Sequence, residues 1–269
     1  MLFAKSNGEG LQVKRKFRTR AVFLITVWIL LLAVSLSLLS ILLATFNSNP
    51  QSQSIVSLSW AGYIIAKDFV NPQLEVIAIN ASWIVPKVNA SAGDGRSSAW
   101  IGIGGQSDKT LIQVGTEHNS LGGQENYYVW YELLPDFAVR VTDIAVSPED
   151  TIVASITLIN SDTNQWNIQI SDVTNGQAFS SNVIYNSTRS SGEWILERPN
   201  VNNQISTLSD FGNITFRDCY ININHLTGTI AKFPFSKIQM RNSQIAQLTS
   251  VSTLSADGSS FTVSYQRGS

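Results

Sequence analysis

The sequence predicts an all-β body, a sandwich of two large antiparallel sheets, preceded by one N-terminal transmembrane helix. Two observations support this fold class. From residue 55 onward, runs rich in Ile, Val, Thr, Tyr, Phe and Trp recur between turn clusters about every ten residues, without a sustained helical period. Before that point, residues 21–46 carry no charged side chain. The chain of 269 residues is long enough for a sizeable core.

Residues 1–20 form a basic tail, with six lysines and arginines against one glutamate. The uncharged run at 21–46 would measure roughly 39 Å as a helix, enough to cross a bilayer. Positive charge stays on the cytoplasmic side, so we expect a single-pass membrane protein with its N-terminus inside and the remainder extracellular. The alternative is a cleaved signal peptide, whose apolar region is typically about 7–15 residues.

A short polar linker is expected at 47–54, followed by a β-sandwich domain at 55–269. Asn-x-Ser/Thr triplets in this domain predict a glycoprotein if the domain is extracellular. A chain rich in Asn, Ser and Thr also makes such triplets by chance. The four triplets begin at Asn80, Asn89, Asn186 and Asn213.

The composition argues against several classes of protein. One cysteine, Cys219, rules out an intramolecular disulfide, a multi-cysteine zinc cluster and a Cys-x-x-Cys redox pair. Two histidines, His118 and His225, argue against a histidine-rich metal centre, and we expect no cofactor. After residue 20 the chain has twelve basic and eighteen acidic residues. A nucleic-acid partner requires a basic face, so none is expected.

Fourteen strands are predicted in the body, each a β-rich run bounded by turn residues. They cover residues 56–66, 74–85, 97–103, 110–116, 126–134, 139–146, 151–159, 166–172, 177–185, 193–198, 214–223, 230–240, 246–254 and 260–265.

Side chains alternate between the two faces of a strand, and in four of these strands the faces differ chemically. One face is apolar, with residues such as Ile101, Val114 and Leu196. The other carries aromatic rings, glycines, an amide and carboxylates, which is typical of a ligand groove rather than a solvated surface. Its members are Trp100, Gly102, Gly104, Leu111, Gln113, Gly115, Tyr128, Trp130, Glu132, Glu193, Ile195 and Glu197.

Six short motifs stand out along the sequence: Ser59-Trp60-Ala61-Gly62-Tyr63, Ala81-Ser82-Trp83-Ile84-Val85-Pro86, Trp100-Ile101-Gly102-Ile103-Gly104-Gly105, Leu111-Ile112-Gln113-Val114-Gly115-Thr116, Trp130-Tyr131-Glu132-Leu133-Leu134-Pro135 and Glu193-Trp194-Ile195-Leu196-Glu197. They resemble motifs of the eqolisins, the glutamic peptidases. They occur in the family order and at similar spacing between residue 59 and about residue 220. Two of them, at 100–105 and 111–116, are similar to the family's W-V-G-I-D-G and I-L-Q-T-G.

The resemblance implies a concanavalin-like sandwich and a metal-independent, acid-acting endopeptidase with polypeptide substrates. The family's catalytic dyad carries over to Gln113 and Glu197. Glu197 would act on water as general base and then as general acid, and Gln113 would donate to the oxyanion. An unshifted glutamate has a pKa of about 4.3, which suits operation in acid. The substrate-binding residues expected from the resemblance are Trp100, Trp130, Glu132 and Glu193.

One residue departs from the family pattern. Gly104 stands where the family has an aspartate, and loss of that carboxylate would weaken the orientation of the dyad unless Glu117 replaces it.

Two other functions fit the same fold. Laminarinase-type glycosidases carry E-x-D-x-E on one strand, whereas Ile195 occupies the middle position between Glu193 and Glu197 here. A catalytically silent carbohydrate-binding domain could use Trp100 and Trp130 as stacking platforms. The isoleucine and the glutamine at position 113 favour the peptidase.

Overall fold

The computed structural model describes residues 53–66, 75–106 and 109–267. The predicted basic tail, the span at 21–46 and the linker up to residue 52 lie outside these ranges, so membrane anchoring stays a prediction. Within the described ranges, no helix combines the length and the hydropathy needed to cross a membrane.

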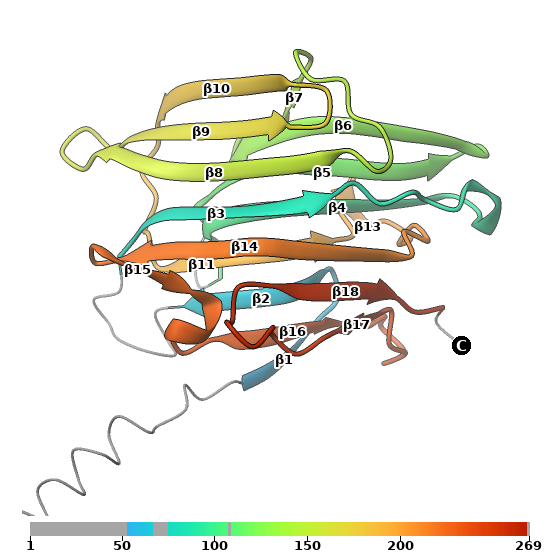
Figure 1. The fold of residues 1–269 in the computed structure, drawn as a ribbon. Helices are drawn as coiled ribbons and strands as arrows, with labels where there is room; N and C mark the ends of the chain where they lie inside the picture. The colour runs from blue at the N-terminus through green and yellow to red at the C-terminus, as the bar shows by residue number, and fades with distance from the viewer. Residues whose placement is uncertain (1–52, 67–74, 107–108, 268–269) are drawn as a thin grey trace, which may run out of the picture. The chain divides into compact units, whose positions relative to one another are not determined.

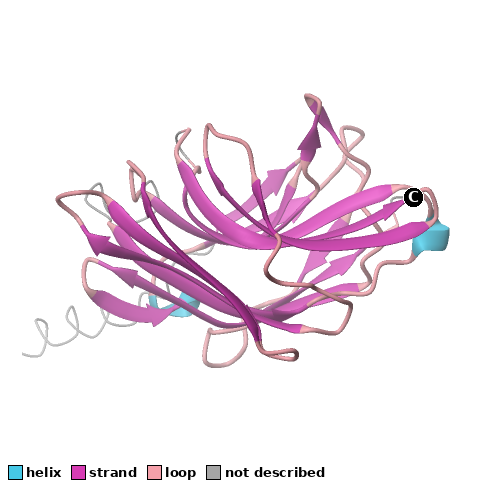
Figure 2. Ribbon diagram, turned by 90° about the horizontal axis from the view of Figure 1, so that it is seen from above, coloured by secondary structure: helices cyan, strands magenta, loops and turns pink. Residues whose placement is uncertain are grey.

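The described residues form two large stacked sheets, as predicted. Sheet I has the order β1-β16-β2-β11-β4-β5-β6-β7, and sheet II has the order β10-β9-β8-β3-β14-β18-β17, with β15 paired to β14. In Figure 1 sheet II lies in front of sheet I, and Figure 2 shows both layers bending in the same direction. Neighbouring strands are antiparallel except at one edge, where β1 pairs with β16 in parallel.

The strands of sheet I are β1 (Gln53–Ser57), β16 (Ser236–Met240), β2 (Trp60–Ala66), β11 (Ser191–Glu197), β4 (Gly95–Gly104), β5 (Leu111–Leu121), β6 (Gln124–Leu133) and β7 (Val139–Val141). Those of sheet II are β10 (Gln177–Ile184), β9 (Gln165–Asp172), β8 (Thr151–Asn160), β3 (Val76–Ile84), β14 (Asn213–Ile223), β15 (Leu226–Thr229), β18 (Phe261–Tyr265) and β17 (Thr249–Val251). The remaining elements are the hairpin of β12 (Asn200–Val201) and β13 (Gln204–Ile205) and the 3₁₀ turns η1 (Ala90–Ala92) and η2 (Ile230–Lys232).

The main hydrophobic core lies between the sheets. The residues assigned to the apolar faces, among them Ile101, Val114 and Leu196, join sheet II residues such as Ile79 and Ile156 in one buried cluster. Trp100, Leu111, Trp130 and Ile195 belong to a second, separate cluster on sheet I. The predicted alternation is therefore confirmed, and it places the second cluster on the face of sheet I that points away from sheet II.

Several predicted strands have different bounds. The predicted strand 56–66 is two strands, because the Ser57 hydroxyl accepts hydrogen bonds from the Ser59 and Trp60 amides and turns the chain between β1 and β2. The predicted strand 230–240 was wrong over its first half, where η2 lies. β7 and β17 contain three residues each, and the β12–β13 hairpin was not predicted.

The four glycosylation triplets differ in exposure. The asparagines at 89, 186 and 213 are exposed. Asn80 is half-buried on β3, and its side-chain amide donates to the carbonyl oxygen of Asp218 at 2.8 Å. Glycosylation at any of them stays a prediction.

Candidate active site

The pairing of four central strands of sheet I brings the predicted groove residues together. Glu197 at the end of β11 lies opposite Ser98 on β4, and Ser98 lies opposite Glu117 on β5. Four residues further along β4, Gly102 lies opposite Gln113, which in turn lies opposite Glu132 on β6. The register therefore makes two rows of polar side chains across the same face, separated by the row of Trp100, Gly115 and Trp130.

A pocket of about 390 Å³ lies over these rows. Both residues of the predicted dyad, Gln113 and Glu197, line it, so their side chains point to the same side of the sheet. Strand β4 runs between the two strands that carry them, β5 and β11. The pocket is lined by Trp60, Arg96, Ser98, Leu111, Gln113, Glu117, Tyr128, Trp130, Glu132, Leu134, Ala138, Glu197, Pro199, Asn200 and Val201.

Glu197 is enclosed by two tryptophans while it still reaches the pocket. The indole N–H of Trp100 donates to Glu197 Oε2 at 2.8 Å. Burial raises the pKa of Glu197 to about 7, hydrogen bonds from Trp100 and Trp60 act in the opposite direction, and the negative charges of Glu117 and Glu132 raise it further. The sequence alone suggested an unshifted carboxyl, because it could not show this burial.

Gln113 is held by Glu132. Its Nε2 donates to Glu132 Oε2 at 2.5 Å, and only 4% of the glutamine residue is exposed. Among the described residues, Gln113 Oε1 is buried without a hydrogen-bond partner. Burial raises the pKa of Glu132, and the hydrogen bond from Gln113 acts against this shift. The amide is therefore fixed in orientation, with one N–H and its oxygen left for a ligand.

Glu117 is a pocket residue that the strand alternation missed. Burial raises its pKa to about 7, while the Ser98 hydroxyl, the charge of Arg96 and the Asn119 side chain lower it. The predicted strand ended at residue 116, whereas β5 continues to Leu121. Extending the alternation of Gln113 and Gly115 by one step would have placed Glu117 in the groove.

The other predicted site residues occupy different positions. Trp130 lines the pocket, and its indole N–H donates to the Ser98 hydroxyl at 3.0 Å. Trp100 is fully buried beneath the pocket, so it contacts Glu197 rather than the pocket surface. Glu193 is also fully buried and is not among the lining residues. The lining of the pocket gives no support for a role of Glu193 in substrate binding, which stays a prediction.

The backbone at Gly104 explains why no carboxylate stands there. Its φ is +91°, a conformation that side chains other than glycine's rarely adopt, and a Cβ atom would lie 2.5 Å from the carbonyl oxygen of Thr110. An aspartate at this position would require the turn between β4 and β5 to change. Glu117 lies elsewhere, in the row of Glu197.

This arrangement combines three carboxyl groups with one oriented amide. Two of the carboxyls, Glu117 and Glu197, have pKa values near 7, which suits a group that exchanges protons with a reacting water. In the described part of the chain, no group of three His, Cys, Asp or Glu residues is arranged to hold a metal ion.

Comparison with known proteins identifies the family. The model of the Peptidase A4 family matches residues 58–265, which is most of the chain and nearly all of its described residues. The chain belongs to the Peptidase A4 family. The resemblance to the eqolisins inferred from the motifs is thereby confirmed.

A curated relative of this family member is Aspergillopepsin-2 from Aspergillus niger, 32% identical over 125 residues. The matched segment covers 45% of the chain and 44% of the relative, so the chain spans less than half the length of that protein.

Two solved structures of glutamic peptidases share the fold. Scytalido-glutamic peptidase, solved with a transition state analog inhibitor, has a TM-score of 0.64 at 20% identity. SCP-B, described as a member of the eqolisin family and solved with the tripeptide Ala-Ile-His, has a TM-score of 0.60 at 20% identity. Each alignment covers 78% of the present chain and 99% of the other. The sandwich fold of these peptidases is therefore shared by most of the chain.

Proposed function

We propose that this family member is a metal-independent endopeptidase that hydrolyses peptide bonds in weakly acidic solution, with Glu197 and Gln113 as its catalytic dyad. The observation that carries the proposal is their shared pocket, in which Trp100 orients the carboxyl group and Glu132 orients the amide. Membership of a peptidase family supports peptides as the substrate class.

The reaction begins with a water molecule between Glu197 and the scissile carbonyl carbon. The Glu197 carboxylate takes a proton from this water as the oxygen attacks the carbonyl carbon. The carbonyl oxygen becomes an oxyanion and accepts a hydrogen bond from the N–H of Gln113 that is not bound to Glu132. Such a donor contributes about 3–4 kcal/mol to transition-state stabilisation. Glu197 then gives its proton to the leaving nitrogen, and the C–N bond breaks.

Glu132 and Trp100 act as positioning residues in this reaction. Glu132 accepts one N–H of the Gln113 amide and thereby sets the plane in which the other N–H points. Trp100 fixes one oxygen of Glu197, and Trp60 also donates a hydrogen bond to this carboxyl group. Neither residue has to touch the scissile bond.

Because the pKa values of these carboxyl groups are raised, we expect the enzyme to work in weak rather than strong acid. With a pKa near 7, about nine-tenths of Glu197 is protonated at pH 6 and almost all of it at pH 5, so in stronger acid it can rarely accept a proton from water. Towards neutral pH, Glu117 ionises, and its negative charge opposes the oxyanion. We therefore expect maximal turnover between about pH 6 and 7.

The test is incubation of the full-length chain with a denatured protein between pH 3 and 8, with pepstatin and EDTA present and with laminarin in a parallel reaction. We expect peptide fragments, no sugar release, and loss of cleavage by about three orders of magnitude in Glu197→Gln with an unchanged melting temperature. Sugar release without proteolysis would favour the carbohydrate alternative. A Glu197→Gln variant with near wild-type turnover would refute the dyad.

A further inference from the structure

Two arginine side chains bring positive charge to the pocket, further along the sheet than Glu197. Arg96 lies on β4 two residues before Ser98, therefore on the same face and about 7 Å along the strand, and it lines the pocket. The guanidinium of Arg140, on β7, lies 4.6 Å from the centre of the Tyr128 ring, and Tyr128 also lines the pocket. Burial raises the pKa of Tyr128, and the charges of both arginines act against that shift, so both are close to it.

Among the described residues, neither of these two arginines forms an ion pair within 4.0 Å, and the pair found at that distance is Arg189 with Glu75. The acidic group that interacts with Arg96 is Glu117, which is buried and largely protonated in weak acid. Arg96 stays charged there and is half-buried. A half-buried cation without a counter-ion gains most from a ligand that brings the opposite charge.

The proposed reaction fixes the side of the scissile bond on which Arg96 lies. Gln113 binds the carbonyl oxygen, and Glu197 gives a proton to the leaving nitrogen. The row of Glu197 and Ser98 is four residues from the row of Gln113, and Arg96 lies two residues further in the same direction. Arg96 is therefore on the leaving-group side of the pocket, which Pro199 and Asn200 also line.

We propose that Arg96 forms a subsite for a substrate carboxylate on the leaving-group side of the scissile bond. This inference rests on the proposed peptidase function and adds a substrate class to it. The planar guanidinium can bind a carboxylate through two parallel hydrogen bonds, which lysine or a neutral side chain cannot reproduce. The carboxylate can belong to an Asp or Glu side chain or to the C-terminus of a short peptide.

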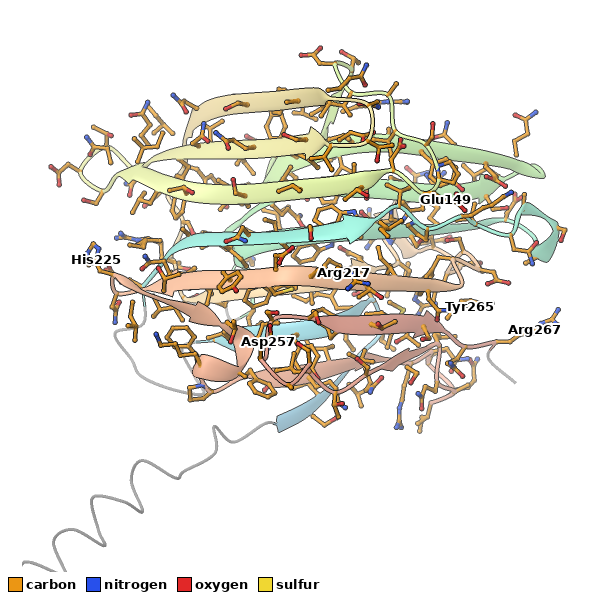
Figure 3. The ribbon with its side chains drawn as sticks, viewed as in Figure 1. Glu149, Arg217, His225, Asp257, Tyr265 and Arg267 are labelled. Atoms are coloured by element: carbon orange, nitrogen blue, oxygen red, sulfur yellow. The ribbon has the colours of Figure 1, made fainter. Side chains whose placement is uncertain are left out.

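The experiment uses the full-length chain at pH 6, where substrate carboxylates are ionised and the arginine stays charged. Three quenched fluorescent peptides of the same sequence are compared. The first carries Glu on the leaving-group side and an amidated end, the second carries Gln there with the same amide, and the third carries Gln with a free C-terminal carboxylate. The proteins are wild type, Arg96→Gln and the control Arg217→Gln, which lies on β14 of sheet II (Figure 3). Binding is measured in parallel by fluorescence anisotropy of the same peptides on Glu197→Gln, with and without Arg96→Gln.

We expect the wild type to favour the Glu peptide over the Gln peptide by about tenfold in KM, and Arg96→Gln to reduce that ratio to about one. Arg217→Gln should keep the wild-type ratio. A preference for the third peptide over the second assigns the subsite to the chain terminus as well. Equal KM values in the wild type, or a ratio that survives Arg96→Gln, would overturn the subsite. If Arg96→Gln shifts the pH profile equally for all three peptides and leaves the ratio of KM values unchanged, Arg96 acts only on Glu117. That result would also overturn the subsite.

Failure of the proposed function gives a different result. If the wild type cleaves none of the peptides, the anisotropy ratio between the Glu and Gln peptides still tests the subsite. A ratio of about ten that falls to one without Arg96 supports a carboxylate-binding pocket, and equal binding rejects it.

Discussion

The indole N–H of Trp100 reaches Glu197 Oε2 at 2.8 Å, and the two residues come from neighbouring strands of the same sheet. Trp100 is fully buried, so it holds the carboxyl group from below while the pocket stays open above it. The stability of the sheet and the orientation of the proposed general base therefore depend on the same side chain.

Replacement of Trp100 by Phe should shift the pH dependence of catalysis upward. The hydrogen bond from Trp100 favours the ionised form of Glu197, so its loss raises a pKa that is already near 7. We expect the acid limb of the kcat/KM profile to move up by about one unit, with about tenfold less activity at pH 5. The profile is measured with a neutral peptide between pH 3 and 8. A limb that stays in place would show that the indole N–H does not control this carboxyl group.

Replacement of Glu117 by Gln should shift the same limb in the opposite direction. The negative charge of Glu117 raises the pKa of Glu197, so an uncharged side chain of the same size lowers it and leaves more base ionised in acid. A downward shift of about half a unit is expected in the same assay. Glu149→Gln, at the exposed residue labelled in Figure 3, is the control that should leave the limb unmoved. An upward shift would contradict the coupling between the two carboxyls.

Replacement of Glu132 by Ala should lower kcat by about tenfold and change KM little, because the Gln113 amide loses the partner that orients it. Glu132→Gln should restore most of the activity, since its amide oxygen can still accept the Gln113 N–H. Equal loss in both variants would mean that the charge of Glu132, rather than its hydrogen bond, matters. Steady-state kinetics on both variants separates these cases.

The fold should lose stability in acid through His118. Its side chain is fully buried, its Nε2 lies 2.8 Å from Thr116 Oγ1, and burial lowers its pKa from 6.5 to about 3. The unfolded chain therefore binds a proton at a higher pH than the folded chain does. Stability from this residue is complete above about pH 6.5 and is lost as pH falls towards 3, by about 3 kcal/mol between pH 6.5 and 4.

Urea unfolding of wild type, His118→Gln and His225→Gln at several pH values checks this loss. The slope of unfolding free energy against pH should flatten in His118→Gln, whatever its stability at pH 7. His225 is exposed, so its replacement should keep the wild-type slope. An unchanged slope in His118→Gln would assign the acid sensitivity to other groups.

The alternation of side chains gave a correct assignment of faces for β4, β5, β6 and β11. Each has apolar residues towards sheet II, whereas the other face mixes aromatic and polar residues with glycines, so the period of two was clear. This was enough to place Gln113 and Glu197 on one side of the sheet from the sequence alone. The hydrogen bonds of Trp100 and Glu132, and the burial that raises the pKa values, depend on packing in three dimensions and left no pattern in the sequence.

The end of β5 shows why strand bounds were harder to predict. Glu117, His118 and Asn119 are polar, and a polar run normally indicates that a strand is ending. Here all three are buried. His118 pairs with Thr116, whose hydroxyl also accepts from the indole N–H of Trp83 on the opposite sheet. The β12–β13 hairpin was missed for another reason, because strands of two residues have no periodicity to detect.

The proposed catalytic groups lie on regular strands rather than on loops. On these strands, residues that face the groove alternate with residues that pack in the core. A deletion of one residue within β11 would turn Leu196 outward and send a glutamate between the sheets, and the same slip in β5 would exchange Gln113 with an aliphatic neighbour. Changes in chain length should therefore be excluded from these strands in natural relatives and in engineered variants. New substrate preferences would instead have to arise by point substitution on the groove face or by insertions in the turns at its rim.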